Sequence, residues 1–201
     1  WLGTGGCHAA TAALVGPAGV GAVRAAQSLV GVLLVGCQAL ELFLPGQAAA
    51  ALGEGGRGGL ARWSRGQAWR LSLGFLALGA GLRVAGSTLI QWLFPDVDAE
   101  LTGIALAGLV WLPAASALTG LLQVSFRALE DTRPVFLAYA ISALASAAAA
   151  VPLVRAYGLT GAAWGFTGAQ VLFALLLLAF FPGGSRSQAG RLERSVSIRH
   201  S

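Results

Sequence analysis

Long apolar runs separated by short polar connections fill most of this chain. A helix that crosses a bilayer needs about 20 mostly apolar residues, and several stretches reach that length. We predict membrane-spanning helices over residues 22–44, 71–93, 103–126, 134–154 and 159–181. Residues 1–16 are also apolar but too short to cross alone, so we expect them to be the end of a truncated sixth helix. The pattern predicts an all-α membrane protein.

The composition supports this prediction. The chain is 56% hydrophobic and only 10% charged, with a mean hydropathy of +0.74, whereas soluble domains carry about 25% charged residues. The alternative is a soluble helical bundle rich in alanine and glycine. However, 13 basic and 8 acidic residues cannot form the polar coat that a soluble protein of this length needs.

The basic residues, all of them arginine, predict the orientation in the membrane. They concentrate in the connection 45–70 (Arg57, Arg62, Arg65, Arg70), the connection 127–133 (Arg127, Arg133) and the tail (Arg186, Arg191, Arg194, Arg199). The other connections contain only Arg155. Because arginine-rich loops mark the cytoplasmic side, we predict a cytoplasmic C-terminus. Residues 1–181 then form the membrane bundle, and residues 182–201 a basic, disordered cytoplasmic tail.

A charged stretch, "SFRALEDTRPVFLAY" (125–139), separates two of the apolar runs. We predict a tight turn between two membrane helices there. Pro134 suits the first position of a helix, where its missing N–H is not needed. Asp131 and Thr132 just before it can cap the positive end of that helix.

The connection 45–70 contains two further patterns. "GEGGRGG" lacks the Lys-Ser/Thr ending of a phosphate-cradling glycine loop. "LARWSRGQAWR" predicts a short interfacial helix, with Trp63 and Trp69 at headgroup depth and its arginines toward anionic lipid.

The residues that bind metals or perform catalysis are sparse. Cys7 and His8 are adjacent, but no second pair follows, since Cys37 and His200 stand alone. Structural metal sites normally use paired ligands at short spacings, so we predict no metal site and no cofactor. No serine or cysteine has a base in a recognisable motif, and we do not expect an enzyme.

Charged residues inside the apolar runs are the candidate substrate-binding residues, because charge within a membrane is costly and usually functional. They are Arg24, Arg83 and Glu41. If the two arginines line a cavity, their guanidinium groups favour phosphate on the substrate. The alternatives are a structural ion pair for Arg83 and, for Arg24 and Glu41, side chains that reach the interface.

Small residues and prolines in the apolar runs predict close packing and kinks. Gly161, Gly165 and Ala169 repeat every four residues, which allows another helix to approach closely. Pro113 and Pro152 predict kinks, which membrane helices tolerate where neighbours satisfy the freed carbonyl groups.

Three stretches resemble a known family: "VGAVRAAQSLVGVLLVGCQALELFLPGQAAAAL" (20–52), "FRALEDTRPVFLAYAIS" (126–142) and "VPLVRAYGLTGAAWGFTGAQVLF" (151–173). They are similar to the C-terminal half of the multidrug/oligosaccharidyl-lipid/polysaccharide exporter superfamily, and most of all to its polysaccharide and O-antigen flippases. The acidic pair Glu130-Asp131 departs from the family, whose members often have a glycine-centred turn there.

The resemblance implies a transporter of two six-helix bundles, of which this chain supplies the C-terminal bundle, helices 7 to 12 with the first truncated. Such a protein flips polyprenyl-pyrophosphate-linked glycans across the bacterial inner membrane by alternating access, for polysaccharide or lipopolysaccharide biosynthesis. The expected partners are the lipid-linked oligosaccharide, membrane lipids and the missing N-terminal bundle, without nucleic acid. The chain begins with Trp1 rather than methionine, and we expect it to be part of a longer protein. The alternatives are a cation-coupled drug exporter of the same superfamily and a non-transporting membrane scaffold or remnant.

Overall fold

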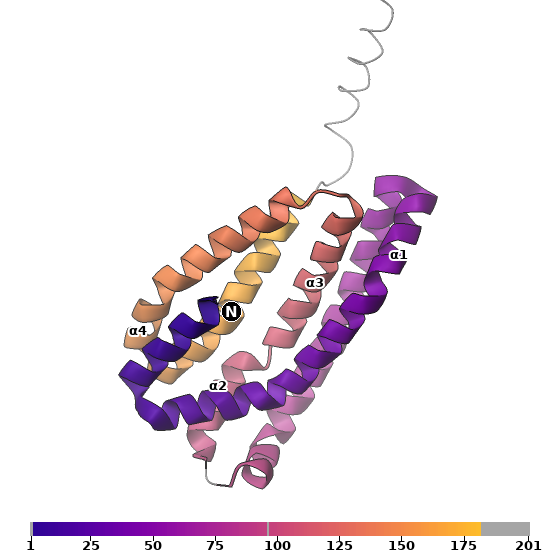
Figure 1. Ribbon diagram of the computed structural model, residues 1–201. Helices are drawn as coiled ribbons and strands as arrows, with labels where there is room; N and C mark the ends of the chain where they lie inside the picture. Colours follow the sequence, from indigo (N-terminus) through magenta and orange to yellow (C-terminus); the bar gives the residue numbers. More distant parts are fainter. Residues whose placement is uncertain (1, 96, 182–201) are drawn as a thin grey trace, which may run out of the picture.

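The chain consists of α-helices joined by short connections (Figure 1). The computed structural model describes residues 2–95 and 97–181, and of residues 2–15 and Ser87 it describes the backbone only. The elements are α1 (Leu2–Leu93), α2 (Ala99–Leu109), α3 (Leu112–Ala128) and α4 (Arg133–Phe180). The described residues contain no strand, and the predicted all-α fold is confirmed. The predicted tail, 182–201, lies outside the described residues.

Two glycines divide α1 into three helical segments. Gly16 (φ 84°, ψ 177°) and Gly56 (φ 57°, ψ −154°) have backbone torsions that residues with a Cβ rarely adopt. The segments 17–55 and 57–93 form an antiparallel hairpin around Gly56, visible as the purple and magenta helices of Figure 1. Gln67 Nε2 donates a hydrogen bond to Gln47 Oε1 across this hairpin, at 3.2 Å.

The hairpin changes our interpretation of residues 45–70. "LARWSRGQAWR" is helical, as predicted, but it is an uninterrupted part of the segment 57–93 and not a separate interfacial helix. Trp63 is half-buried and packs against the cluster that joins Leu60 to α3, and its predicted position at headgroup depth stays a prediction. The alanine-rich sequence before Gly56 favours helix, and burial of Leu44, Ala48 and Leu60 holds both arms on α3.

The helix 99–128 is interrupted between α2 and α3, just before Pro113, where we predicted a kink. Proline lacks an N–H, which leaves carbonyl groups of the preceding turn without their helical partner. The hydroxyl of Thr167, on α4, donates a hydrogen bond to the Gly108 carbonyl at 2.7 Å. A side chain from a neighbouring helix thus replaces a bond that the break removes.

The turn after α3 has the geometry of a Schellman C-cap. The N–H of Glu130 donates to the Arg127 carbonyl at 3.0 Å, and the N–H of Asp131 donates to the Phe126 carbonyl at 3.2 Å. Glu130 has a φ of 55° at the position where glycine is usual. The tight turn predicted at 127–133 is therefore present, closed by backbone bonds and with a strained glutamate at its centre. The Thr132 side chain, in contrast to our expectation, makes no capping bond to α4.

A third glycine divides α4 into two arms, 133–157 and 159–180. Gly158 has a φ of 56° and a ψ of −131°, and the chain reverses there. Gly161 then lies directly against the Leu153 carbonyl oxygen of the first arm, where a Cβ would collide with it. The predicted close approach at this glycine is confirmed, and its partner is the other arm of the same element. Pro152 does not interrupt the first arm, and the predicted kink there is replaced by the reversal six residues later.

α3 lies between the Gly56 hairpin of α1 and the arms of α4 (Figure 1), while the part of α1 around Ala22 and Val30 packs directly on α2 and α4. One buried cluster joins α1 to α3 through Leu44, Leu60, Leu121 and Val124. A second cluster joins α3 to both arms of α4 through Phe126, Ala138, Phe173 and Leu177. Stretches within 16–86, 99–128 and 133–180 are long and apolar enough to cross a membrane. The predicted six-helix half of a two-bundle transporter goes beyond this and stays a prediction.

Candidate functional site

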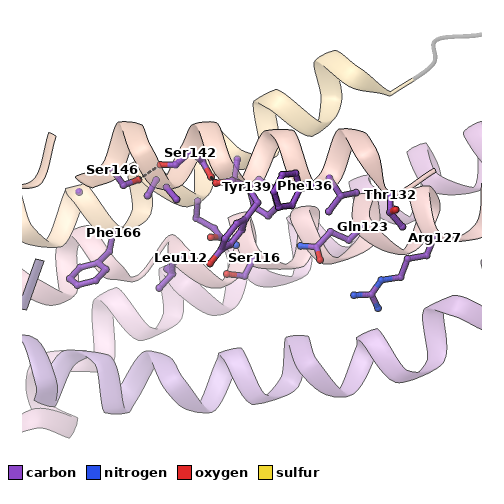
Figure 2. Close-up of a pocket in the computed structure, with 16 residues that line it drawn as sticks. Leu112, Ser116, Gln123, Arg127, Thr132, Phe136, Tyr139, Ser142, Ser146 and Phe166 are labelled. Atoms are coloured by element: carbon purple, nitrogen blue, oxygen red, sulfur yellow. Dashed lines mark hydrogen bonds between the residues drawn. The ribbon is translucent and has the colours of Figure 1, made fainter. Parts of the chain in front are cut away.

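A groove lies between α3 and the two arms of α4. Its volume is about 720 Å³, within the ~300–1,000 Å³ typical of small-molecule sites. Figure 2 shows it from the side, with α3 below the first arm of α4. Its lining consists of Leu112, Ser116, Gln123, Arg127, Thr132, Val135, Phe136, Tyr139, Ser142, Ala143, Ser146, Gly165, Phe166, Ala169, Gln170 and Phe173.

Hydrogen bonds from the second arm of α4 fix one wall of the groove. Gln170 Nε2 donates to Thr119 Oγ1 on α3 at 2.9 Å, and Thr167 bonds to the end of α2 as described above. The rings of Phe173 and Tyr139 meet edge to face, with centroids 6.0 Å apart, and join the two arms. The wall is therefore held by polar contacts to α3 and an aromatic contact between the arms.

Several polar groups in the groove have no partner among the described residues. Ser142 and Ser146 donate to carbonyl groups of their own helix, at 3.0 Å and 2.6 Å. The side chains of Ser116, Gln123 and Tyr139 make no hydrogen bond within the described part of the chain. Figure 2 shows Tyr139 reaching from α4 toward α3, where Ser116 and Gln123 line the opposite wall. Unused donors and acceptors from two facing helices can hold a polar ligand.

Among the residues that the structure describes, Arg127 is the only charged one that lines this groove. It lies in the last turn of α3, and its side chain is exposed. Figure 2 shows it at the end of the groove near Thr132. This end also carries the hairpin turn of α1 and the end of α4 (Figure 1), and we call it the arginine-rich end because Arg57, Arg62, Arg65, Arg127 and Arg133 surround it. The groove is thus neutral over most of its length and positive at one end.

The three predicted substrate-binding residues are all on α1, and none lines the groove. The side chains of Arg24 and Arg83 are exposed, and neither forms an ion pair with another described residue. Glu41 lies against Gly120 of α3, where an added Cβ would come within 2.5 Å of Glu41 Oε1. The structure therefore separates the arginines from the groove and brings only the glutamate to α3. Their role in a substrate cavity stays a prediction.

Sequence reasoning missed the groove residues because single polar side chains in an apolar run attract little attention. A signal was present, since Leu112, Ser116, Gln123 and Arg127 share one face of α3 at helical spacing. The second wall could not be predicted, because it depends on how the two arms of α4 fold around Gly158.

The described residues contain no group of three or more metal-ligating side chains. Cys37 is buried, and its thiol donates a hydrogen bond to the Pro113 carbonyl oxygen at 3.4 Å. The side chains of Cys7 and His8 lie outside the described residues, as does His200.

Comparisons of the chain with protein-family models, with curated proteins and with solved structures find no match.

Proposed function

We propose that this chain is the C-terminal half of a transporter that moves polyprenyl-pyrophosphate-linked glycans across the bacterial cytoplasmic membrane. The observation that carries the proposal is the groove between α3 and α4, with unpartnered hydroxyl and amide groups along it and Arg127 at one end. A glycan offers many hydroxyl groups to such side chains, and a pyrophosphate matches a guanidinium group.

The aromatic lining also supports an amphiphilic substrate. Phe136, Tyr139 and Phe166 contribute rings to the groove, and sites for organic ligands combine apolar walls with a few placed polar groups. A transporter of organic cations would be expected to place acidic side chains in its cavity, and the described residues that line the groove include none. This difference favours the flippase over the drug exporter.

The distribution of arginine supports a cytoplasmic position of the arginine-rich end. In this orientation the hairpin turn at Gly56, the α3–α4 connection and the end of α4 face the cytoplasm. The exposed Arg83 lies in an apolar run, and contact with lipid there would be costly. We propose that it faces the N-terminal bundle of a longer protein or the aqueous cavity between the two bundles.

Translocation in vesicles tests the function directly. The chain is reconstituted into phosphatidylcholine vesicles with a fluorescent polyprenyl-pyrophosphate-linked sugar, and a membrane-impermeant quencher reports the fraction in the outer leaflet. We expect the protected fraction to fall as the lipid moves outward. Because the proposal assigns half of a transporter to this chain, the same assay is run with the full-length protein of the gene.

The outcomes separate the three candidate functions. Movement of the glycolipid, with no cation-driven uptake of an organic dye such as ethidium, supports the flippase. Dye uptake without glycolipid movement would assign the protein to drug export. If the full-length protein moves neither probe, the transport proposal is wrong and a scaffold remains.

A further inference from the structure

The height of the groove in the membrane follows from one interhelical hydrogen bond. The hydroxyl groups of Ser64 on α1 and Ser125 on α3 are 2.8 Å apart and buried, so these residues lie at the same height. Trp69 follows Ser64 by five residues, about 7 Å along α1. Arg127 follows Ser125 by two residues in the opposite direction, about 3 Å. Along the helix axes, the backbone of Arg127 thus lies about 10 Å farther from the middle of the helical bundle than the backbone of Trp69 does.

Trp69 marks the edge of the apolar region on this side. Its side chain is 68% exposed, and Phe43, equally far from Gly56 on the other arm of the hairpin, is 70% exposed. Exposed tryptophan beside arginine is typical of the membrane–water interface. The headgroup layer extends about 5–8 Å beyond the hydrocarbon core. Because helical side chains lean toward the N-terminus, the guanidinium group of Arg127 reaches down into this layer.

The remaining groove lies below this level. Leu112, at its far end, precedes Arg127 by 15 residues, about 22 Å along α3 and close to the middle of a bilayer. Ser116, Gln123 and Tyr139, whose hydroxyl and amide groups make no hydrogen bond within the described part of the chain, lie between these ends. The order from headgroup level to membrane centre is therefore a cation first, and then neutral hydrogen-bonding groups set among apolar side chains such as Phe136 and Phe166.

An ordinary bound phospholipid would use the apolar walls of the groove but would leave its hydroxyl and amide groups without partners. Below the phosphate of a phospholipid come apolar chains, which cannot use hydroxyl and amide groups. A lipid-linked glycan can use them if its sugar enters the groove and its chain stays in the surrounding bilayer. Glu130 and Asp131 lie beyond Arg127 in the connection and outside the groove lining, so they weaken anion binding without occupying the groove.

We infer that Arg127 holds the phosphate of the substrate at headgroup level while the glycan lies below it in the groove, toward the membrane centre. This inference rests on the proposed function for the identity of the substrate, and it adds the orientation and the residues that impose it. Arg127 binds the anionic group, and Gln123, with Ser116 and Tyr139, binds the sugar. The prenyl chain leaves the groove sideways into the leaflet of the arginine-rich end.

Three ligands with the same prenyl group separate these contributions: farnesol, farnesyl pyrophosphate and farnesyl pyrophosphate linked to N-acetylglucosamine. The affinity of each ligand for the protein in phosphatidylcholine nanodiscs is measured from the quenching of tryptophan fluorescence. We expect the pyrophosphate to strengthen binding at least about tenfold, the size of a hydrogen-bonded charge. We expect the sugar to add a further gain of about threefold to tenfold.

The variants assign each gain to a residue. Arg127→Ala should remove the gain from pyrophosphate, whereas Arg65→Ala, an exposed arginine of the same end outside the groove, should keep it. Gln123→Leu should remove the gain from the sugar and keep the gain from pyrophosphate. Neither Arg127 nor Gln123 is fully buried within the protein, so we expect both variants to fold. Circular dichroism verifies the fold of each variant.

Two results would overturn the inference. If Arg127→Ala still binds farnesyl pyrophosphate more strongly than farnesol, Arg127 is not the anion-binding residue. If Gln123→Leu binds farnesyl pyrophosphate more strongly, the prenyl chain of the ligand, and not its sugar, occupies the groove. Failure of the proposed function has a different outcome, because the three affinities can follow the expected order in a protein that translocates nothing.

Discussion

The two faces of α3 differ in how completely they are closed. The face toward α1 is dry and tightly packed: Leu121 and Val124 are buried against Leu44 and Leu60, and Ser125 bonds to Ser64. The face toward α4 is buried at Leu122 and Phe126. It opens into the groove at Ser116, Gln123 and Arg127. The same helix therefore provides a fixed contact on one side and a ligand-sized cavity on the other.

Side-chain size and shape explain the difference. Leucine, valine and alanine fill the space between α1 and α3, and interiors of this kind are packed without large voids. On the other side, the large rings of Phe136 and Tyr139 come from α4, and short side chains such as Ser116 face them. Beside the groove, the Gln170–Thr119 hydrogen bond and the cluster around Phe126 and Phe173 hold α4 against α3. A bundle can thus keep a cavity open when one helix contributes bulk and the other contributes small polar groups.

The largest expected effect comes from filling the open face. Ser116→Phe places a ring in the groove, and we expect it to abolish binding of the pyrophosphate-linked sugar in the nanodisc assay. Ser28→Phe, at an exposed serine of α1, adds the same ring elsewhere and should leave binding unchanged. Normal binding by Ser116→Phe would mean that the ligand does not use the groove.

Truncation on the two faces should have unequal effects on stability. Leu121→Ala leaves a cavity on the closed face, where Leu121 is 0% exposed, and should lower the free energy of unfolding by about 2–5 kcal/mol. Gln123→Ala, two residues away on the open face, should change it by less than about 0.5 kcal/mol. Denaturant titration in mild detergent measures both, and equal losses would contradict the difference between the faces.

A smaller effect is expected where α3 is joined to α4. Glu130→Gly removes the strain of a positive φ at a residue with a Cβ, and should raise the free energy of unfolding by about 1 kcal/mol. Glu130→Ala removes the same charge but keeps the Cβ, and therefore serves as the control. If the alanine variant is stabilised as much as the glycine variant, then charge, not backbone strain, limits the stability of this turn.

Part of the fold was predictable because it depends on local sequence. The apolar runs predict helices, and "LEDTRP" predicts the turn between α3 and α4, which is confirmed. The extension of both α1 arms through residues 45–70 to the reversal at Gly56 was not predicted, because the arginines and glycines of this stretch resemble a polar loop. There, burial of Leu44, Ala48 and Leu60 against α3 outweighs the local signals.

The site was less predictable than the fold. Arg24 and Arg83 were predicted to bind substrate because they are charged residues in apolar runs. The structure places both on the exposed surface of α1. Arg127 was assigned to a connection and to topology, although its position at the end of a face that includes Ser116 and Gln123 makes it part of the groove. Charge can be counted from a sequence, whereas the cavity that a charge faces depends on a neighbouring helix.

The sequence by itself determined the helical class, the apolar character and the clustering of arginine, because each follows from composition and from residues close together in the chain. Only the tertiary structure decided which face of α3 closes and which stays open. That choice depends on the reversals at Gly56 and Gly158, which bring α1 and the two arms of α4 to opposite sides of α3. It also depends on packing between residues far apart in sequence, such as Gln170 with Thr119, which no local pattern contains.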